Sequence, residues 1–149
     1  MGKVNVVIVD ATGNKEQRVG LPDDIKCGII MVKLVEKIKL PSVGPDGNPI
    51  AVHVMDGAFL VSYEVAVKKA YTAVAVKMST MELKPLAQPG ASLYGIQFTN
   101  GGRIVIFGGG DPLYGEGGRI IGGLGVSGGS EEQDAALSAF GRAYFENLN

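Results

Sequence analysis

Apolar residues follow several different spacings along the chain, and each spacing predicts a different element. Residues 4–9 are β-branched and nearly all apolar, which is typical of a strand buried on both faces. Turn residues follow, and residues 15–19 are expected to form a return strand. Across residues 22–40 apolar positions recur at helical spacing, which predicts an amphipathic helix. The stretch 41–49 is rich in proline and glycine and is predicted to be a loop.

The middle of the chain predicts one further strand and two helices. Residues 50–55 have strand character. Ser62 is expected to cap a helix that runs to about Met78. Because this helix is apolar on almost all sides, we expect it to lie between two partners, the sheet and a second subunit. Ser79 and Glu82 fit a capping box at the start of a short third helix.

Glycine-rich turns divide the last third of the chain into short elements. Their predicted order is a strand at 93–98, a hairpin turn at 99–102, a strand at 103–107, a break at 108–112, a turn at 115–118 and a glycine-diluted strand at 119–126. Ser130 and Gln133 then fit the capping box of a C-terminal helix. Together the elements predict one α+β domain over residues 1–149, with a mostly antiparallel sheet flanked by helices.

Composition narrows the function classes. The chain has 14 Lys and Arg against 15 Asp and Glu, and this balance argues against a nucleic-acid partner. Cys27 is the single cysteine and is expected to pack rather than react, and His53 is the single histidine. We therefore expect neither a cysteine-clustered zinc site nor a histidine-rich metal site. The chain shows no signal-peptide pattern and no apolar stretch of membrane-spanning length, so we expect a cytoplasmic protein without a membrane partner.

Two glycine clusters are the first candidate for chemistry. One contains Gly109 and Gly110, and the other, Gly128-Gly129-Ser130, immediately precedes the C-terminal helix. Exposed backbone N–H groups and the positive end of that helix dipole would receive a carboxylate or a phosphate. The alternative is that these glycines only permit tight turns, and the acidic Glu131 and Glu132 next to them oppose an anion.

Lys69 is the second candidate, because it lies among small and apolar residues of the middle helix. Desolvation there would lower the pKa of its amine, as suits a general base or a partner for a ligand carboxylate. The alternative is a lysine that reaches solvent along the helix surface or forms a salt bridge, for example to Asp56 or Glu64. His53 is the third candidate, either as an axial ligand for haem or one arm of a metal site, or as an ordinary hydrogen-bonded residue of a strand.

Several motifs resemble the GlcG/HbpS-like family. They are Met55-Asp56-Gly57-Ala58, Lys69-Ala70-Tyr71-Thr72-Ala73 and the run Gly122 to Gly129 with Gln133-Asp134. This family includes haem-binding proteins and the C-terminal domain of PduO-type adenosyltransferases. The resemblance implies a profilin-like fold, with a five-stranded antiparallel sheet flanked by helices, and a homo-oligomer. It also makes haem a possible cofactor and Tyr71 and Thr72 candidate ligand contacts, while Val54 replaces an arginine that is usual in the family.

The N-terminal third departs from the family pattern. The segment Val4 to Asn14 looks like a family strand that normally follows the first helix, but here it precedes that helix. We infer that the strand at 4–9 fills the vacant place in the sheet, either in its own subunit or in a neighbouring one.

Three functions remain open from the sequence. The first is a small-ligand binding protein that acts as an accessory or sensor protein. Its ligand would be haem, another tetrapyrrole or a carboxylate metabolite. The pocket would lie between helix 62–78 and the glycine clusters, with Tyr71, Phe107 and Tyr114 as apolar walls. The second is an acid–base isomerase, lyase or hydratase of a small organic acid, with Lys69 as base, Asp56 or Asp134 as acid and the N–H groups at 128–130 as oxyanion donors. The third is a structural oligomer without a ligand.

Overall fold

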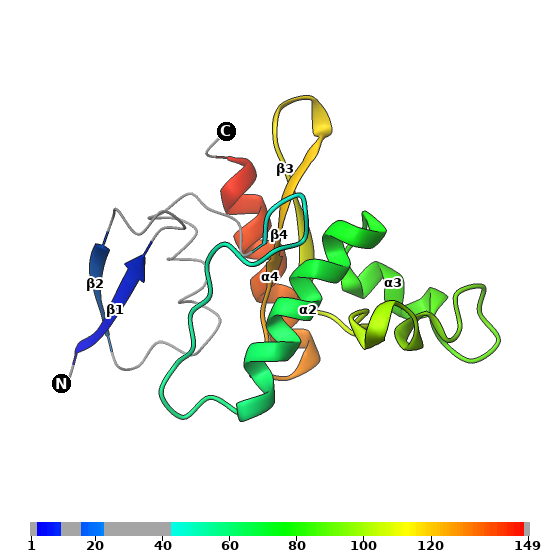
Figure 1. Ribbon diagram of the computed structural model, residues 1–149, viewed down its shortest axis with the longest axis horizontal. Helices are drawn as coiled ribbons and strands as arrows, with labels where there is room; N and C mark the ends of the chain where they lie inside the picture. The colour runs from blue at the N-terminus through cyan, green and yellow to red at the C-terminus, as the bar shows by residue number, and fades with distance from the viewer. Residues whose placement is uncertain (1–2, 10–15, 23–42, 148–149) are drawn as a thin grey trace.

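The computed structural model describes residues 3–9, 16–22 and 43–147, and within them the protein has an α+β architecture (Figure 1). Its helices and strands, in chain order, are β1 (Lys3–Val9), β2 (Glu16–Pro22), α2 (Leu60–Val76), α3 (Thr80–Leu86), β3 (Gly110–Tyr114), β4 (Ile120–Gly125) and α4 (Glu131–Glu146). Short 3₁₀ turns lie at Ile96–Phe98, Asn100–Gly102 and Glu116–Gly118.

The N-terminal hairpin confirms the two strands predicted there. β1 pairs antiparallel with β2, and Val6 lies opposite Val19. Among the described residues β2 is the sheet neighbour of β1, so the insertion of strand 4–9 into the main sheet stays a prediction. The helix predicted for residues 22–40 falls almost entirely outside the described residues, as does Cys27.

The second sheet contains β3 and β4, paired antiparallel, and α2 and α4 pack on its opposite faces (Figure 1). Leu124 of β4 joins Leu113 and Phe145 in a buried cluster on the α4 side. On the α2 side a Cβ at Gly123 would lie 2.5 Å from the carbonyl oxygen of Ala70, and a Cβ at Gly125 would overlap that of Ala66. The glycines of β4 therefore allow the backbone of α2 to lie directly against the sheet.

Both predicted capping boxes are confirmed. The Ser79 hydroxyl accepts from the N–H of Glu82, and the Ser130 hydroxyl accepts from the N–H of Gln133, with the reciprocal bond present in each case. The start of α2 was wrongly predicted, because the helix begins at Leu60 and Ser62 is buried in its first turn rather than capping it. We find the end of α2 at Val76, followed by Lys77 in the left-handed conformation.

The predicted five-stranded sheet is not found in the described part of the chain, because three predicted strands are irregular segments. Residues 93–98 and the turn after them form 3₁₀ turns, since Gly95, Gly101 and Asn100 all take positive φ angles. At 103–107 the N–H of Val105 donates to the Thr72 hydroxyl of α2, at 3.0 Å, instead of to a neighbouring strand. The segment 50–55 is also without regular structure.

The break predicted at 108–112 is wrong from Gly110 onward, because β3 begins there and contains Pro112. Pro112 lies opposite Gly123, whose N–H and carbonyl both bond to Val43 on the other edge of β4. Because the ladder requires no N–H from Pro112 at this position, the proline does not interrupt the strand.

Candidate functional site

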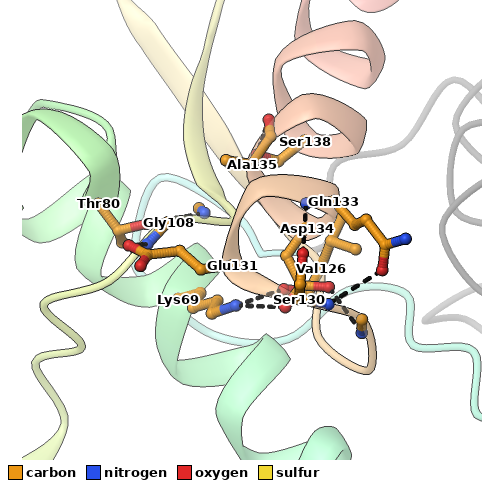
Figure 2. A network of polar contacts seen from close by, with 12 residues as sticks. Lys69, Thr80, Gly108, Val126, Ser130, Glu131, Gln133, Asp134, Ala135 and Ser138 are labelled. Atoms are coloured by element: carbon orange, nitrogen blue, oxygen red, sulfur yellow. Dashed lines mark hydrogen bonds and ion pairs between the residues drawn. The ribbon is translucent and has the colours of Figure 1, made fainter.

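Lys69 lies at the centre of a buried polar network that joins α2 to α4 (Figure 2). Its side chain is fully buried, and its Nζ donates to Oδ2 of Asp134 at 2.8 Å and to the carbonyl oxygen of Val126 at 2.9 Å. The ring centroid of Phe107 lies 4.7 Å from the same nitrogen. The predicted salt bridge of Lys69 is therefore present, but its partner is Asp134 rather than Asp56 or Glu64.

Two of the backbone N–H groups predicted to bind an anion, those of Gly129 and Ser130, are bonded to side chains of α4. The N–H of Gly129 donates to Oδ1 of Asp134 at 3.0 Å, and that of Ser130 donates to Oε1 of Gln133 at 3.0 Å. Gly128, with a φ of 140°, turns the chain just before them. An incoming carboxylate would have to displace these side chains in order to use the same donors.

Gly109 and Gly110 enclose the ion pair from the β3 side. A Cβ at Gly109, which has a φ of +115°, would lie 2.7 Å from Nζ of Lys69. A Cβ at Gly110 would overlap the backbone carbonyl of Lys69. The N–H of Gly110 donates to the Thr80 hydroxyl at 2.9 Å. Both glycines therefore permit close packing around Lys69.

Burial is the main influence on the Lys69 amine. Desolvation lowers the pKa of Lys69 below its usual value, and the hydrogen bond and charge of Asp134 act against this shift. The amine of Lys69 on α2 bonds to the Val126 carbonyl, just after β4, and to the Asp134 carboxylate on α4. It therefore connects these three parts of the fold. This geometry supports a structural connection better than proton exchange with a substrate.

The other residues predicted to form the site lie outside the Lys69 network. The Thr72 hydroxyl donates to the carbonyl of Lys68 at 2.7 Å. The Tyr71 ring lies 3.6 Å from the guanidinium of Arg103, and its hydroxyl accepts from the Asn100 side chain. Asp56 is exposed in a turn and forms no part of the Lys69 network. The structure thus brings Asp134, Gly109, Gly110 and Gly129 to Lys69, and leaves Asp56, Tyr71 and His53 elsewhere.

A pocket of about 50 Å³ lies between the segment 51–58, residues 62–67 of α2 and the end of β4, and it shares Val126 with the Lys69 network. Its lining residues are Ala51, Val52, His53, Val54, Met55, Ala58, Ser62, Tyr63, Ala66, Val67, Gly125, Val126 and Ser127. Within the described residues, Nε2 of His53 is buried and has no hydrogen-bond partner. A buried imidazole nitrogen without a partner is uncommon and is a candidate for ligand binding.

Burial also determines the protonation of His53. Desolvation lowers the pKa of His53 below 6.5, and the nearby charge of Asp56 opposes that shift. The imidazole is therefore neutral at neutral pH, which is the form that coordinates a metal ion.

We expect His53 to make the protein less stable in mild acid. Because its pKa is lower in the folded than in the unfolded state, the unfolded chain binds more protons as the pH falls through 6.5, and the free energy of unfolding decreases. Urea denaturation at about pH 7.5 and about pH 5.5 measures this change. His53→Gln should reduce the difference between the two pH values, and an unchanged difference would contradict the assignment. Burial raises the pKa of Asp111, so this carboxyl changes the stability with pH in the opposite direction. Asp111 is present in both the unaltered protein and His53→Gln, so its contribution cancels in the comparison.

Sequence reasoning found His53 but missed the pocket around it. The signals that could have indicated it are the alternation of Ala51, His53 and Met55 along an extended segment, and the helical spacing of Ser62 and Ala66. Placing these two sets beside the end of β4 requires the tertiary structure.

Two features are absent from the described residues. No group of three or more His, Cys, Asp or Glu side chains there could hold a metal ion. None of the helices described is both long and apolar enough to cross a membrane.

Comparison with known proteins agrees with the motifs. Residues 40–143 match the family model described as "Haem degrading protein HbpS-like". The chain is 47% identical over 102 residues to an uncharacterized 15.0 kDa protein of the dhaT-dhaS intergenic region of Citrobacter freundii, covering 68% of this chain and 71% of that protein. It is also 47% identical over 111 residues to the corrinoid adenosyltransferase PduO of the same organism, covering 72% of this chain and 33% of PduO.

Solved structures show the same relationship. The Klebsiella pneumoniae protein ORFY is similar with a TM-score of 0.68 and 33% identity, over 84% of this chain and 97% of that one. The crystal structure of the PduOC:heme complex is similar with a TM-score of 0.67 and 38% identity, over 85% of this chain and 95% of that one. On the match to residues 40–143 and these likenesses, the chain belongs to the HbpS-like family.

Proposed function

We propose that this protein binds haem at the pocket between segment 51–58, α2 and the end of β4, with His53 as the axial ligand. The observation that supports this most directly is the buried Nε2 of His53, which has no hydrogen-bond partner among the described residues. The similarity to PduOC, whose crystal structure is that of a heme complex, supports the choice of ligand.

The chemistry of the lining residues suits the apolar part of such a ligand. Most of the lining side chains are apolar, which suits the faces and edges of a porphyrin, and a neutral imidazole is a common axial ligand of haem iron. Bound haem would supply a redox-active iron. The chain itself would hold the imidazole neutral and exclude water through Ala66, Val67 and Val126.

The size of the pocket indicates how the ligand would enter. Its volume of about 50 Å³ is far below the roughly 300–1,000 Å³ that encloses a drug-sized ligand, so only part of a macrocycle would enter it. Large apolar side chains next to the pocket are exposed, and Phe59, Leu60 and Val61 have 71%, 98% and 61% of their surface accessible. We propose that a second copy of the chain covers this region, which retains the expected homo-oligomer.

This proposal makes the protein an accessory or sensor protein rather than an acid–base enzyme. The enzyme hypothesis depends on Lys69, but that amine is fully buried and bonded to Asp134. The lining of the pocket includes neither residue.

The test is a haem titration followed by absorption in the Soret region. We expect saturable binding by the unaltered protein and a loss of at least about tenfold in affinity for His53→Ala, with a changed Soret spectrum. Gln97→Ala is the matched control, because among the described residues Gln97 also has a buried side-chain atom without a partner, but it lies outside the lining of the pocket. Binding that His53→Ala leaves unchanged would refute the proposal.

Native mass spectrometry of the same complex measures the bound mass and the number of chains together. We expect haem to be retained on an assembly of more than one copy. Haem on a single chain would contradict the covering role proposed for a second copy.

A further inference from the structure

Val126 belongs both to the pocket at His53 and to the buried network at Lys69. It lines the pocket together with its chain neighbours Gly125 and Ser127. Its carbonyl oxygen accepts a hydrogen bond from Nζ of Lys69 at 2.9 Å (Figure 2). One wall of the pocket is therefore bonded directly to a lysine that lies outside the lining.

The backbone of this wall, residues 125–127, is held by contacts with three parts of the fold. The N–H of Val126 donates to the carbonyl of Gly109 at 2.8 Å, and Gly125 lies directly against the backbone of α2 at Ala66. The bond from Lys69 fixes the next peptide group, the one that joins Val126 to Ser127. Because residues on both sides of this peptide group line the pocket, its orientation determines the shape of the wall.

Asp134 and Gly109 keep the amine of Lys69 in place. Oδ2 of Asp134 accepts from Nζ of Lys69 at 2.8 Å, and Oδ1 accepts from the N–H of Gly129, just after the wall, at 3.0 Å. On the other side, a Cβ at Gly109 would lie 2.7 Å from Nζ and 2.7 Å from the carbonyl oxygen of Val126. The amine is thus closely surrounded at the point where it bonds to the wall.

From these contacts we infer that Lys69 is a positioning residue of the ligand pocket, which holds the wall 125–127 in place through the carbonyl of Val126. The inference rests on the proposed function for the identity of the ligand and adds how the pocket is kept in shape. A wall that is fixed before binding does not have to be ordered when the ligand arrives. The affinity for haem should therefore depend on a hydrogen bond outside the lining.

The test is a haem titration of the double variant Lys69→Met with Asp134→Asn. This variant removes the bond to Val126, and it avoids the unpaired buried carboxylate that Lys69→Met alone would leave. We expect haem to bind at least about fivefold more weakly, with a changed Soret spectrum.

Ser138→Ala is the control for stability. It removes a buried hydrogen bond between α4 and Asp111 of β3, but it leaves the bond from Lys69 to Val126 in place. We expect lower stability and a haem affinity within about twofold of that of the unaltered protein. Equal losses of affinity in Ser138→Ala and the double variant would show that affinity follows stability, and would overturn the inference.

His53 tests the inference in the absence of haem. As the single histidine it gives one set of imidazole ring signals in NMR spectra, and it lines the same pocket. We expect these signals to move in the double variant and to stay in place in Ser138→Ala. Since the double variant removes one positive and one negative charge, the movement would not come from net charge.

The unaltered protein supplies a measurement that does not depend on the folding of a variant. Haem should slow the hydrogen exchange of the Gly129 N–H, which bonds to Asp134, by at least about threefold. The Ser130 N–H, which bonds to Gln133, is the matched control and should exchange at an unchanged rate. Equal effects at the two positions would overturn the inference.

The outcomes separate the inference from the proposed function. Ring signals of His53 that stay in place in the double variant would overturn the positioning role of Lys69. Ring signals that move, together with haem binding that is indifferent to His53→Ala, would overturn the proposed function and leave the positioning role intact.

Discussion

Replacing Lys69 by methionine is expected to lower the free energy of unfolding by about 3–5 kcal/mol. Methionine has a similar length and fills most of the space, so the main effect is electrostatic. The change leaves the Asp134 carboxylate, which is almost completely buried, without its cation, and it leaves the carbonyl of Val126 without the lysine donor. Urea denaturation followed by circular dichroism measures the change.

The neighbouring residue supplies the control. Lys68→Met makes the same chemical change one position earlier, but Lys68 is partly exposed and pairs with the exposed Glu64. We expect it to change the free energy of unfolding by no more than about 0.5 kcal/mol. The double variant Lys69→Met with Asp134→Asn should recover part of the loss, because it removes the buried charge. Equal effects of Lys69→Met and Lys68→Met would show that the buried ion pair does not stabilise the fold.

Gly125→Ala is expected to destabilise the protein by about 3 kcal/mol or more, or to prevent folding. The added methyl group would overlap the carbonyl of Ala66 and lie 2.8 Å from the backbone nitrogen of Ala70. Both are backbone atoms of α2, so the helix as a whole would have to move away from β4. Thermal unfolding and the yield of folded protein measure the effect.

Gly117→Ala separates this steric effect from the general effect of losing a glycine. Gly117 has a φ of +69°, and no described neighbour lies within 4 Å of the point that an added methyl group would occupy. Only backbone strain of about 1 kcal/mol is therefore expected there. If Gly125→Ala were no more harmful than Gly117→Ala, the close approach of α2 to β4 would be incorrect.

Local signals predicted the elements that depend on local contacts. The capping boxes at Ser79 and Ser130 are satisfied within three residues, so the sequence is sufficient to locate the starts of α3 and α4. The segment 93–107 was wrongly predicted, because two apolar runs on either side of Thr99-Asn100-Gly101-Gly102 are typical of a hairpin. The positive φ angles at Gly95 and Asn100 turn the chain, and Ile104 and Val105 are buried without a strand partner in the described residues.

The candidate site shows the same division between local and distant information. The small neighbours of Lys69 on α2 indicated a desolvated amine, with a solvent-reaching or salt-bridged lysine as the alternative, and the side chain is buried. Its partner could not be identified in the same way, because Asp134 is 65 positions away and several other carboxylates were equally plausible. His53 was singled out as the only histidine, but the pocket around it forms from three segments that meet only in the folded chain.

The ion pair between Lys69 and Asp134 has a consequence for synthesis of the chain on the ribosome. The lysine is translated 65 residues before its carboxylate, so a nascent chain ending anywhere between them contains α2 with an amine that has no counterion from α4. Closing a loop of this length is entropically unfavourable and slow compared with forming a helix. Chains arrested before residue 134 should therefore remain sensitive to protease, and resistance should develop abruptly once α4 has left the exit tunnel.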